Sequence, residues 1–295
     1  MIIDEKQKAR IINYNKYIWE NRLGEKDIED WLNNFNGKVF SDIKEKEIAI
    51  DLLKNFLYYN ENEIKYLCKT VFLIFKRKKI GEFLMNCSSL GEAEKLFKKY
   101  LEKCRFSHIG RPSESGCFML YYFRQSNKLP ISIFLDRWED ITQEIRSILF
   151  IDDFLGTGST AVRFWNNPIV QNLVKEYPDI ELYYLVIFAL KNGIINVKTN
   201  TNFNIISSQI FNEEYRIFSN ESYVFPKKEK RKIARCICEK YGKYLEGNKY
   251  ALGYNDSEAL LGFHHNIPNN TLPIIWSTKN EWHPLFKREG KRYRW

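Results

Sequence analysis

The chain has 295 residues, of which 44% are hydrophobic and 28% are charged. These values lie near globular averages, so they exclude a disordered tail, a collagen-like fibre and a small disulfide scaffold. The net charge of +9 suits an anionic partner such as a phosphate, a nucleotide or a nucleic acid. Most of the surplus lies in residues 226–295, which carry 15 Lys and Arg against 7 Asp and Glu. We therefore expect any anionic macromolecule to dock in that part of the chain.

Residues 1–105 are predicted to form a helical N-terminal region, because apolar residues recur there at three- and four-residue spacing. Ser89 followed by Glu92 predicts a capped helix near the end of this region. Nothing in the region is typical of a catalytic motif. Residues 1–10 mix acidic with basic side chains and lack the apolar stretch of a secretory signal, which favours a cytoplasmic protein.

Residues 106–225 change to short β-rich runs that alternate with helix-length segments, which predicts an α/β fold with a parallel sheet flanked by helices. The predicted strands are 131–135, 147–151, 181–190 and 203–207. Ser159–Tyr177 is predicted to be a crossover helix. The apolar runs are far shorter than the roughly 20 residues that span a bilayer, so we expect no membrane segment. The six cysteines show no metal-ligand spacing and are expected to be reduced thiols, mostly in the core.

Residues 226–295 are predicted to contain a basic helix opened by Pro226, followed by a loop-rich tail that is expected to form a ligand-facing lid. The helix has an apolar stripe that includes Ile237 and either Tyr244 or Leu245. Its basic residues at 227–235 are a candidate nucleic-acid contact, and the alternative is an ordinary solvated helix face.

Residues 147–160 hold the most informative motif: a buried strand, then Asp152 and Asp153, then a tight loop and the start of a helix. The loop offers backbone amides and hydroxyls, which suit a phosphate. Its residues are Gly156, Thr157, Gly158, Ser159 and Thr160. The two carboxylates suit sugar hydroxyls, a Mg²⁺ ion or both. Ligands of open α/β sheets bind at the carboxyl ends of strands, and this motif would lie there.

Other interpretations fit this motif less well. A P-loop needs a Lys before the hydroxyl residue and a different spacing, and the G-x-G-x-x-G pattern of dinucleotide folds is absent. The remaining alternative is structural: a strand that ends in two Asp residues before a turn that caps a helix.

The motif resembles the PRPP-binding motif of type I phosphoribosyltransferases, which is a hydrophobic strand, two acidic residues and a Thr-Gly-x-Thr loop. The resemblance implies that Asp152 and Asp153 hold the ribose hydroxyls and assist Mg²⁺, while residues 157–160 hold the 5-phosphate. Many purine-salvage members have an acid immediately before the Thr-Gly pair. Gly156 stands at that position here, which argues against purine salvage.

Members of this family also have a pyrophosphate loop after an earlier strand. The candidates here are Arg111, Ser113, Glu114, Ser115 and Gly116, and the alternative is an ordinary loop that caps the following helix. Arg137 is a candidate cation in a mobile loop, although an isolated Arg in a mixed-charge segment is more often simply solvated.

The tail supplies candidates for binding a base or another acceptor, because paired His and Asn residues beside aromatics can stack on a base and hydrogen-bond it. These candidates are Phe263, His264, His265, Asn266, Asn269, Asn270 and Trp276. The structural alternative is a set of buried amides that satisfy an irregular backbone. Zinc binding by the adjacent histidines is disfavoured, because no third ligand is suitably spaced.

The acidic motif and the tail together resemble the phosphoribosyltransferase-like proteins of bacterial conflict systems, including those encoded beside retron reverse transcriptases or ATPases. The resemblance covers most of residues 106–295, which we therefore predict to be one phosphoribosyltransferase-like domain after the helical region 1–105. It implies an antiphage effector, toxic until a reverse transcriptase–RNA or ATPase partner restrains or triggers it. We expect a Mg²⁺-dependent enzyme acting on PRPP or a related ribose phosphate. The alternative is a non-catalytic PRPP or nucleotide sensor that acts through a partner protein.

Overall fold

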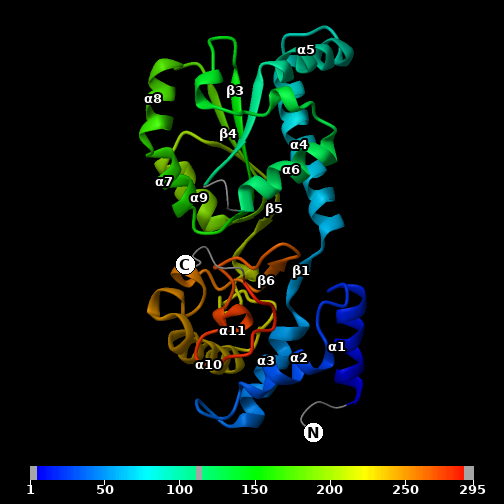
Figure 1. Cartoon of the computed structure of the whole chain (residues 1–295), viewed down its shortest axis with the longest axis vertical. Helices are drawn as coiled ribbons and strands as arrows, with labels where there is room; N and C mark the ends of the chain where they lie inside the picture. The colour runs from blue at the N-terminus through cyan, green and yellow to red at the C-terminus, as the bar shows by residue number, and fades with distance from the viewer. Residues whose placement is uncertain (1–4, 111–114, 289–295) are drawn as a thin grey trace. The chain divides into compact units, whose positions relative to one another are not determined.

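A computed structural model describes residues 5–110 and 115–288 of the chain (Figure 1). It divides the protein into two compact units. The sheet unit comprises residues 62–210, and the terminal unit comprises residues 1–61 together with 211–295. The boundary predicted at 105/106 separates helix-rich from strand-rich sequence and stays a prediction. By compactness, the helices that follow residue 61 group with the sheet.

Among the described residues of the sheet unit, four strands form a sheet in the order β2-β3-β4-β5. They are β2 (Cys104–His108), β3 (Ser147–Leu155), β4 (Glu181–Leu190) and β5 (Asn204–Phe211). The β2–β3 and β3–β4 pairs are parallel, with Ser147 opposite Glu181 and Asp152 opposite Val186. The predicted α/β class with a parallel sheet is therefore confirmed.

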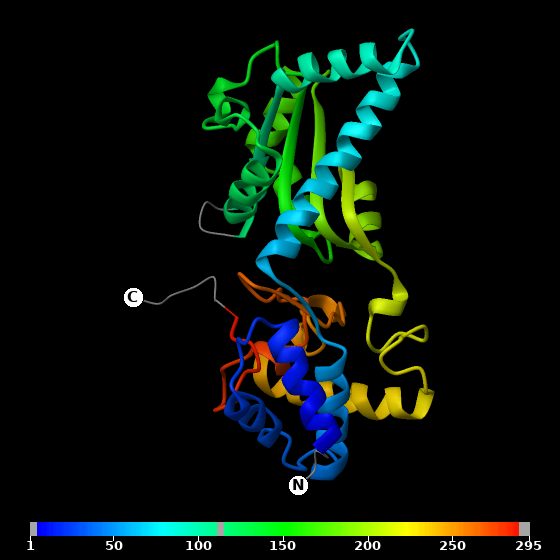
Figure 2. The ribbon, with the colours of Figure 1, turned by 90° about the vertical axis from the view of Figure 1, so that its right-hand side faces the viewer.

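Helices cover both faces of this sheet (Figures 1 and 2). One face carries α4 (Glu61–Leu84), α5 (Leu90–Glu102) and α6 (Ser115–Asn127), and the other carries α7 (Ser159–Trp165), α8 (Pro168–Glu176) and α9 (Lys191–Asn200). Successive strand residues point to opposite faces, so Tyr183 packs on Phe75 of α4 while Tyr184 packs on Phe203. The Ser89 cap is confirmed, since its side chain accepts a hydrogen bond from the Glu92 amide.

Two local predictions in this unit are wrong. Residues 131–135 do not form a strand: Ile131–Ile133 is a 3₁₀ turn after Pro130, and Phe134 makes only an isolated bridge to Phe106. The helix predicted over Ser159–Tyr177 is two helices. Pro168 lacks the amide that would continue the first helix, so it opens α8 instead, with Asn167 as the cap.

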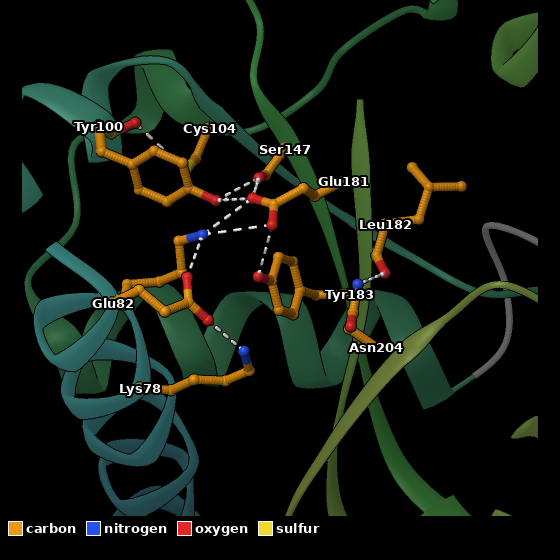
Figure 3. Close-up of polar contacts among 10 residues, drawn as sticks. Lys78, Glu82, Tyr100, Cys104, Ser147, Glu181, Leu182, Tyr183 and Asn204 are labelled. Atoms are coloured by element: carbon orange, nitrogen blue, oxygen red, sulfur yellow. Dashed lines mark hydrogen bonds and ion pairs between the residues drawn. The ribbon is translucent and has the colours of Figure 1, made fainter. Parts of the chain in front are cut away.

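A partly buried polar network lies at the amino end of β3 and β4 (Figure 3). The Glu181 carboxylate accepts hydrogen bonds from Tyr100 (2.8 Å), Ser147 (3.1 Å) and Lys79 (3.0 Å). Lys79 on α4 is 5% exposed and also pairs with Glu82 at 2.7 Å. Burial alone would lower the pKa of Lys79, but its hydrogen bonds to the two carboxylates raise it. The network fixes α4 and α5 to the end of the sheet away from the carboxylate motif.

The terminal unit joins the two ends of the chain in one core. Its elements are α1 (Glu5–Tyr17), α2 (Glu25–Asn33), α3 (Asp42–Lys54), α10 (Lys228–Glu246), α11 (Pro273–Trp276), and the parallel strands β1 (Leu57–Tyr59) and β6 (Leu261–Phe263). The indoles of Trp31 and Trp282 both donate to the Ile274 carbonyl oxygen, at 2.7 and 2.9 Å. In α10 the apolar stripe ends at buried Leu245, while Tyr244 is exposed.

The cysteines are free thiols, as predicted, and three of the six are buried. Over residues 5–110 and 115–288, none of the helices combines the length and apolar character needed to cross a bilayer.

Candidate functional site

The carboxylate motif lies inside β3 rather than after it. The strand continues through Asp152 and Asp153 to Leu155, which pairs with Ala189 of β4. The backbone that carries the carboxylates is therefore held by a neighbouring strand. Asp153 is buried and Asp152 is partly exposed. Although Asp152 and Asp153 are successive strand residues, their side chains contact each other at this end of β3.

Asp152 is held by two donors. Its Oδ2 accepts a hydrogen bond from the Tyr184 hydroxyl of β4 at 2.6 Å, and its Oδ1 accepts from the Asp153 amide at 2.9 Å. Tyr184 is 1% exposed, so its hydroxyl has a fixed direction. Burial and the negative charge of Asp153 raise the pKa of Asp152 well above its ordinary value, against the opposing effect of the Tyr184 bond. Such a carboxyl pair favours any ligand that supplies positive charge or hydroxyl donors.

The loop after β3 is shaped by Gly158, which has φ +79° and precedes the first residue of α7. A Cβ there would lie 2.8 Å from Val197 Cγ2 and 2.9 Å from the Gly193 carbonyl oxygen, so a larger residue does not fit. Thr157 Oγ1 and Ser159 Oγ are 3.0 Å apart. Thr157, Ser159 and Thr160 are all partly exposed. The structure thus brings the predicted loop residues and both carboxylates together along one strand–turn–helix segment.

Two residues that the sequence analysis missed contact this loop from α9. Asn196 Nδ2 donates to the Thr157 carbonyl oxygen at 2.7 Å. Gly193 packs so closely that a Cβ there would lie 2.0 Å from the Gly156 carbonyl oxygen. The one local signal for this contact is a glycine within the helical segment that follows β4.

The candidate pyrophosphate loop is only partly described. Arg111, Ser113 and Glu114 lie outside the described residues, and Ser115 is the first residue of α6. Gly116 lies against the end of β2, where a Cβ would be 2.9 Å from the Ile109 carbonyl oxygen. His108 pairs with Ile151, one residue before Asp152, so the start of α6 and the carboxylates share the carboxyl edge of the sheet. Arg137 is exposed, and its amide donates to Asp140 in a 3₁₀ turn (Trp138–Asp140).

The base or acceptor candidates belong to the terminal unit. Phe263, Asn270 and Trp276 are buried, and the Trp276 indole donates to the Thr271 carbonyl oxygen at 2.8 Å. The other four are partly exposed: His264, His265, Asn266 and Asn269. Their role in binding a base stays a prediction. Among the described residues there is no group of three His, Cys, Asp or Glu side chains that could hold a metal ion.

The basic segment at 227–235 is divided between surface and core. Arg231 is 8% exposed, and its guanidinium donates to the Phe225 carbonyl oxygen at 3.1 Å and to Asn220 Oδ1 at 2.9 Å. Lys230 pairs with Asp51, and Arg235 pairs with Glu258. The exposed cations are Lys227, Lys228 and Lys232. Binding of nucleic acid here stays a prediction, and it would depend on these three lysines more than on Arg231.

Comparison with known proteins gives one match over most of the chain. The model of the PRTase-CE family matches residues 28–288. Among solved structures, the chain is similar to the Helicobacter pylori xanthine-guanine-hypoxanthine phosphoribosyltransferase. That match has 10% identity and a TM-score of 0.27, and it covers 53% of this chain and 84% of the other. No curated protein sequence matches the chain.

Proposed function

The chain belongs to the PRTase-CE family, and from this premise we propose that the carboxyl end of β3 binds PRPP, or a related ribose phosphate, and breaks the bond at its anomeric carbon. The observation that carries the proposal is the continuous segment of Asp152, Asp153 and the loop 156–160. It offers acceptors for ribose hydroxyls beside amides and hydroxyls for a phosphate. Ligands with only one of these two groups would leave half of the site unused.

In this proposal the Asp152 and Asp153 carboxylates accept hydrogen bonds from the 2- and 3-hydroxyls of the ribose. The Tyr184 hydroxyl and the Asp153 amide hold the Asp152 carboxylate in place for that contact. Thr157, Ser159 and Thr160 donate to the 5-phosphate. The sugar is then fixed at both ends, which orients the anomeric carbon toward an attacking acceptor.

The donor set also fits Mg²⁺, although no three-ligand cluster occurs among the described residues. Mg²⁺ usually takes one or two carboxylates together with substrate phosphates and water, and Asp152 with Asp153 provides that share. When bound, the ion supplies charge stabilisation for the departing diphosphate. Burial and the Asp153 charge both raise the pKa of Asp152, so a cation beside the pair would favour the ionised form of Asp152.

The experiment measures PRPP binding by calorimetry and pyrophosphate release in the presence of Mg²⁺ and candidate acceptors: bases, nucleotides and nucleic acids. Wild-type protein is expected to bind PRPP and release pyrophosphate with at least one acceptor. The Asp152→Asn/Asp153→Asn variant is expected to lose both activities while it stays folded. Absence of PRPP binding by the folded wild type would overturn the proposal.

A second candidate function for the same segment is that of a non-catalytic sensor of PRPP or a nucleotide. Gly156 favours it, because this position provides no side chain to meet an acceptor base and its carbonyl oxygen packs against Gly193. Binding without turnover across every acceptor would select the sensor.

The family resemblance to conflict systems supports a role as a toxic antiphage effector. If that role depends on this segment, cells that express the Asp152→Asn/Asp153→Asn variant should lose toxicity or defence. Toxicity that survives in a folded double variant would place the effector activity elsewhere in the chain.

A further inference from the structure

The second turn of α9 lies directly against the loop that follows the carboxylates. Asn196 Nδ2 donates a hydrogen bond to the Thr157 carbonyl oxygen at 2.7 Å, although the two residues are 39 positions apart. One turn earlier in α9, Gly193 leaves room for the Gly156 carbonyl oxygen, which would be 2.0 Å from a Cβ at that position. Two successive carbonyl groups of the loop are therefore turned toward the same helix.

The direction of these carbonyl groups sets the direction of the next two amides. In a planar trans peptide, the C=O of one residue and the N–H of the next point in opposite directions. The amides of Thr157 and Gly158 therefore point away from α9. Gly158 continues the turn in the left-handed conformation, with φ +79°. Successive amides on one side of such a turn form the concave arrangement that binds anions.

The Asn196 amide has its own orientation fixed from within α9. Asn200 Nδ2 donates to Asn196 Oδ1 at 2.9 Å and to the Asn196 carbonyl oxygen at 2.8 Å. The Thr157 carbonyl oxygen can only accept, and Asn196 Oδ1 accepts from Asn200, so one orientation of the amide satisfies both bonds. A series of donors thus runs from Asn200 through Asn196 to the loop.

We propose that Asn196 is a positioning residue for ligand binding: by holding the Thr157 carbonyl against α9, it keeps the Gly158 amide directed at the 5-phosphate of the bound ribose phosphate. The ligand in this statement rests on the proposed function. The arrangement of the loop does not, and it can be tested without any ligand. Asn196 itself touches the loop backbone and has no part in the chemistry at the anomeric carbon.

The test uses three variants of the full-length protein. Asn196→Ala removes the donor, and Asn196→Asp keeps the shape but replaces the donor by an acceptor facing the Thr157 carbonyl oxygen. Thr199→Ala is the matched control, because Thr199 lies on α9 and its hydroxyl bonds only within the helix, to the Ile195 carbonyl oxygen. PRPP binding with Mg²⁺ is measured by calorimetry, amide hydrogen exchange is measured by mass spectrometry, and thermal unfolding is measured for each variant.

Asn196→Ala is expected to weaken PRPP binding by about fivefold to tenfold, the effect of one ordinary hydrogen bond. Asn196→Asp should weaken it further, and Thr199→Ala should leave it unchanged. Faster hydrogen exchange should be confined to peptides that cover residues 156–160. A merely structural role for Asn196 would instead raise exchange across the sheet unit and lower the melting temperature in proportion.

Failure of this proposal is distinct from failure of the proposed function. If wild type does not bind PRPP, the proposed ligand is wrong, and hydrogen exchange alone decides whether Asn196 orders the loop. If wild type binds PRPP and Asn196→Ala binds equally well, the positioning role is overturned. Unchanged exchange at 156–160 in both Asn196 variants overturns it as well.

Discussion

Gly193→Ala is expected to displace the loop after β3 and to weaken PRPP binding more than any single hydrogen-bond deletion would. The new Cβ would lie 2.0 Å from the Gly156 carbonyl oxygen, whereas contacts under 3.0 Å are essentially never found. The loop or α9 must therefore move by about 1 Å. A displacement of that size in a positioning element costs about tenfold to a hundredfold in function.

The effect of this variant on stability is smaller than its effect on binding. Forcing an extra carbon into a packed site costs about 1–3 kcal/mol, and the gain in helix propensity from Gly to Ala returns about 0.5–1 kcal/mol. Gly81→Ala is the matched control, because Gly81 lies within α4 with nothing within 4 Å of its added Cβ. That control should gain stability and bind PRPP normally. If Gly193→Ala gains stability like the control and binds PRPP like wild type, α9 does not press on the loop.

Three further predictions concern the Asp152–Asp153 pair and the polar network around Lys79 and Glu181. Asp152→Asn should raise the melting temperature at neutral pH by about 2–4 °C per kcal/mol of stability gained. Burial and the Asp153 charge raise the pKa of Asp152, and a carboxyl whose pKa is raised by folding destabilises the fold at any pH above its unfolded pKa. This gain should vanish below the unfolded pKa, where the carboxyl is protonated in both the folded and the unfolded state. A fall in melting temperature at neutral pH would contradict the prediction. Binding of Mg²⁺ and PRPP should weaken as pH falls toward the raised pKa, because the ligand needs the ionised pair; calorimetry across pH would show this, and a pH-independent affinity would refute it. Lys79→Met should cost about 1–3 kcal/mol in urea unfolding, because the Lys79 ammonium is buried between two carboxylates. Lys78→Met should cost less than about 1 kcal/mol, because Lys78 is exposed. Equal costs would mean that the contacts of Lys79 with Glu82 and Glu181 add nothing.

The stabilisation by the Lys79–Glu181 ion pair also depends on pH. Burial alone would raise the pKa of Glu181, but hydrogen bonds from Lys79 and Tyr100 lower it below the ordinary value. The ion pair therefore stabilises the fold above the unfolded pKa of the carboxyl and is lost as pH falls through the folded pKa. The stability difference between Lys79→Met and wild type should shrink over that acidic range.

Local sequence patterns predicted the structure correctly where the residues that determine it are adjacent in the chain. The strand 181–190 is found as predicted because it is apolar almost throughout, and the motif at 152–160 is recognisable because its parts are adjacent in sequence. Pattern failed at 131–135, where Pro130 introduces a turn beside β2.

Local sequence patterns could not predict contacts between segments that lie far apart in the chain. Asn196 looks like any polar residue on a helix, and only the folded sheet unit brings it to Thr157. The sequence predicts Arg231 to be part of a basic surface stripe. In the structure its guanidinium is buried and donates to the Phe225 carbonyl oxygen and to Asn220 Oδ1. The β1–β6 pair joins two segments that no periodicity connects.

The most direct test of the account is calorimetric titration of wild type and of the Asp152→Asn/Asp153→Asn variant with PRPP in the presence of Mg²⁺. Wild type is expected to bind PRPP saturably with one ligand per chain, and the folded double variant is expected to show no measurable binding. A wild type that does not bind PRPP, or a double variant that binds it equally well, would contradict the assignment of this segment as a ribose phosphate site.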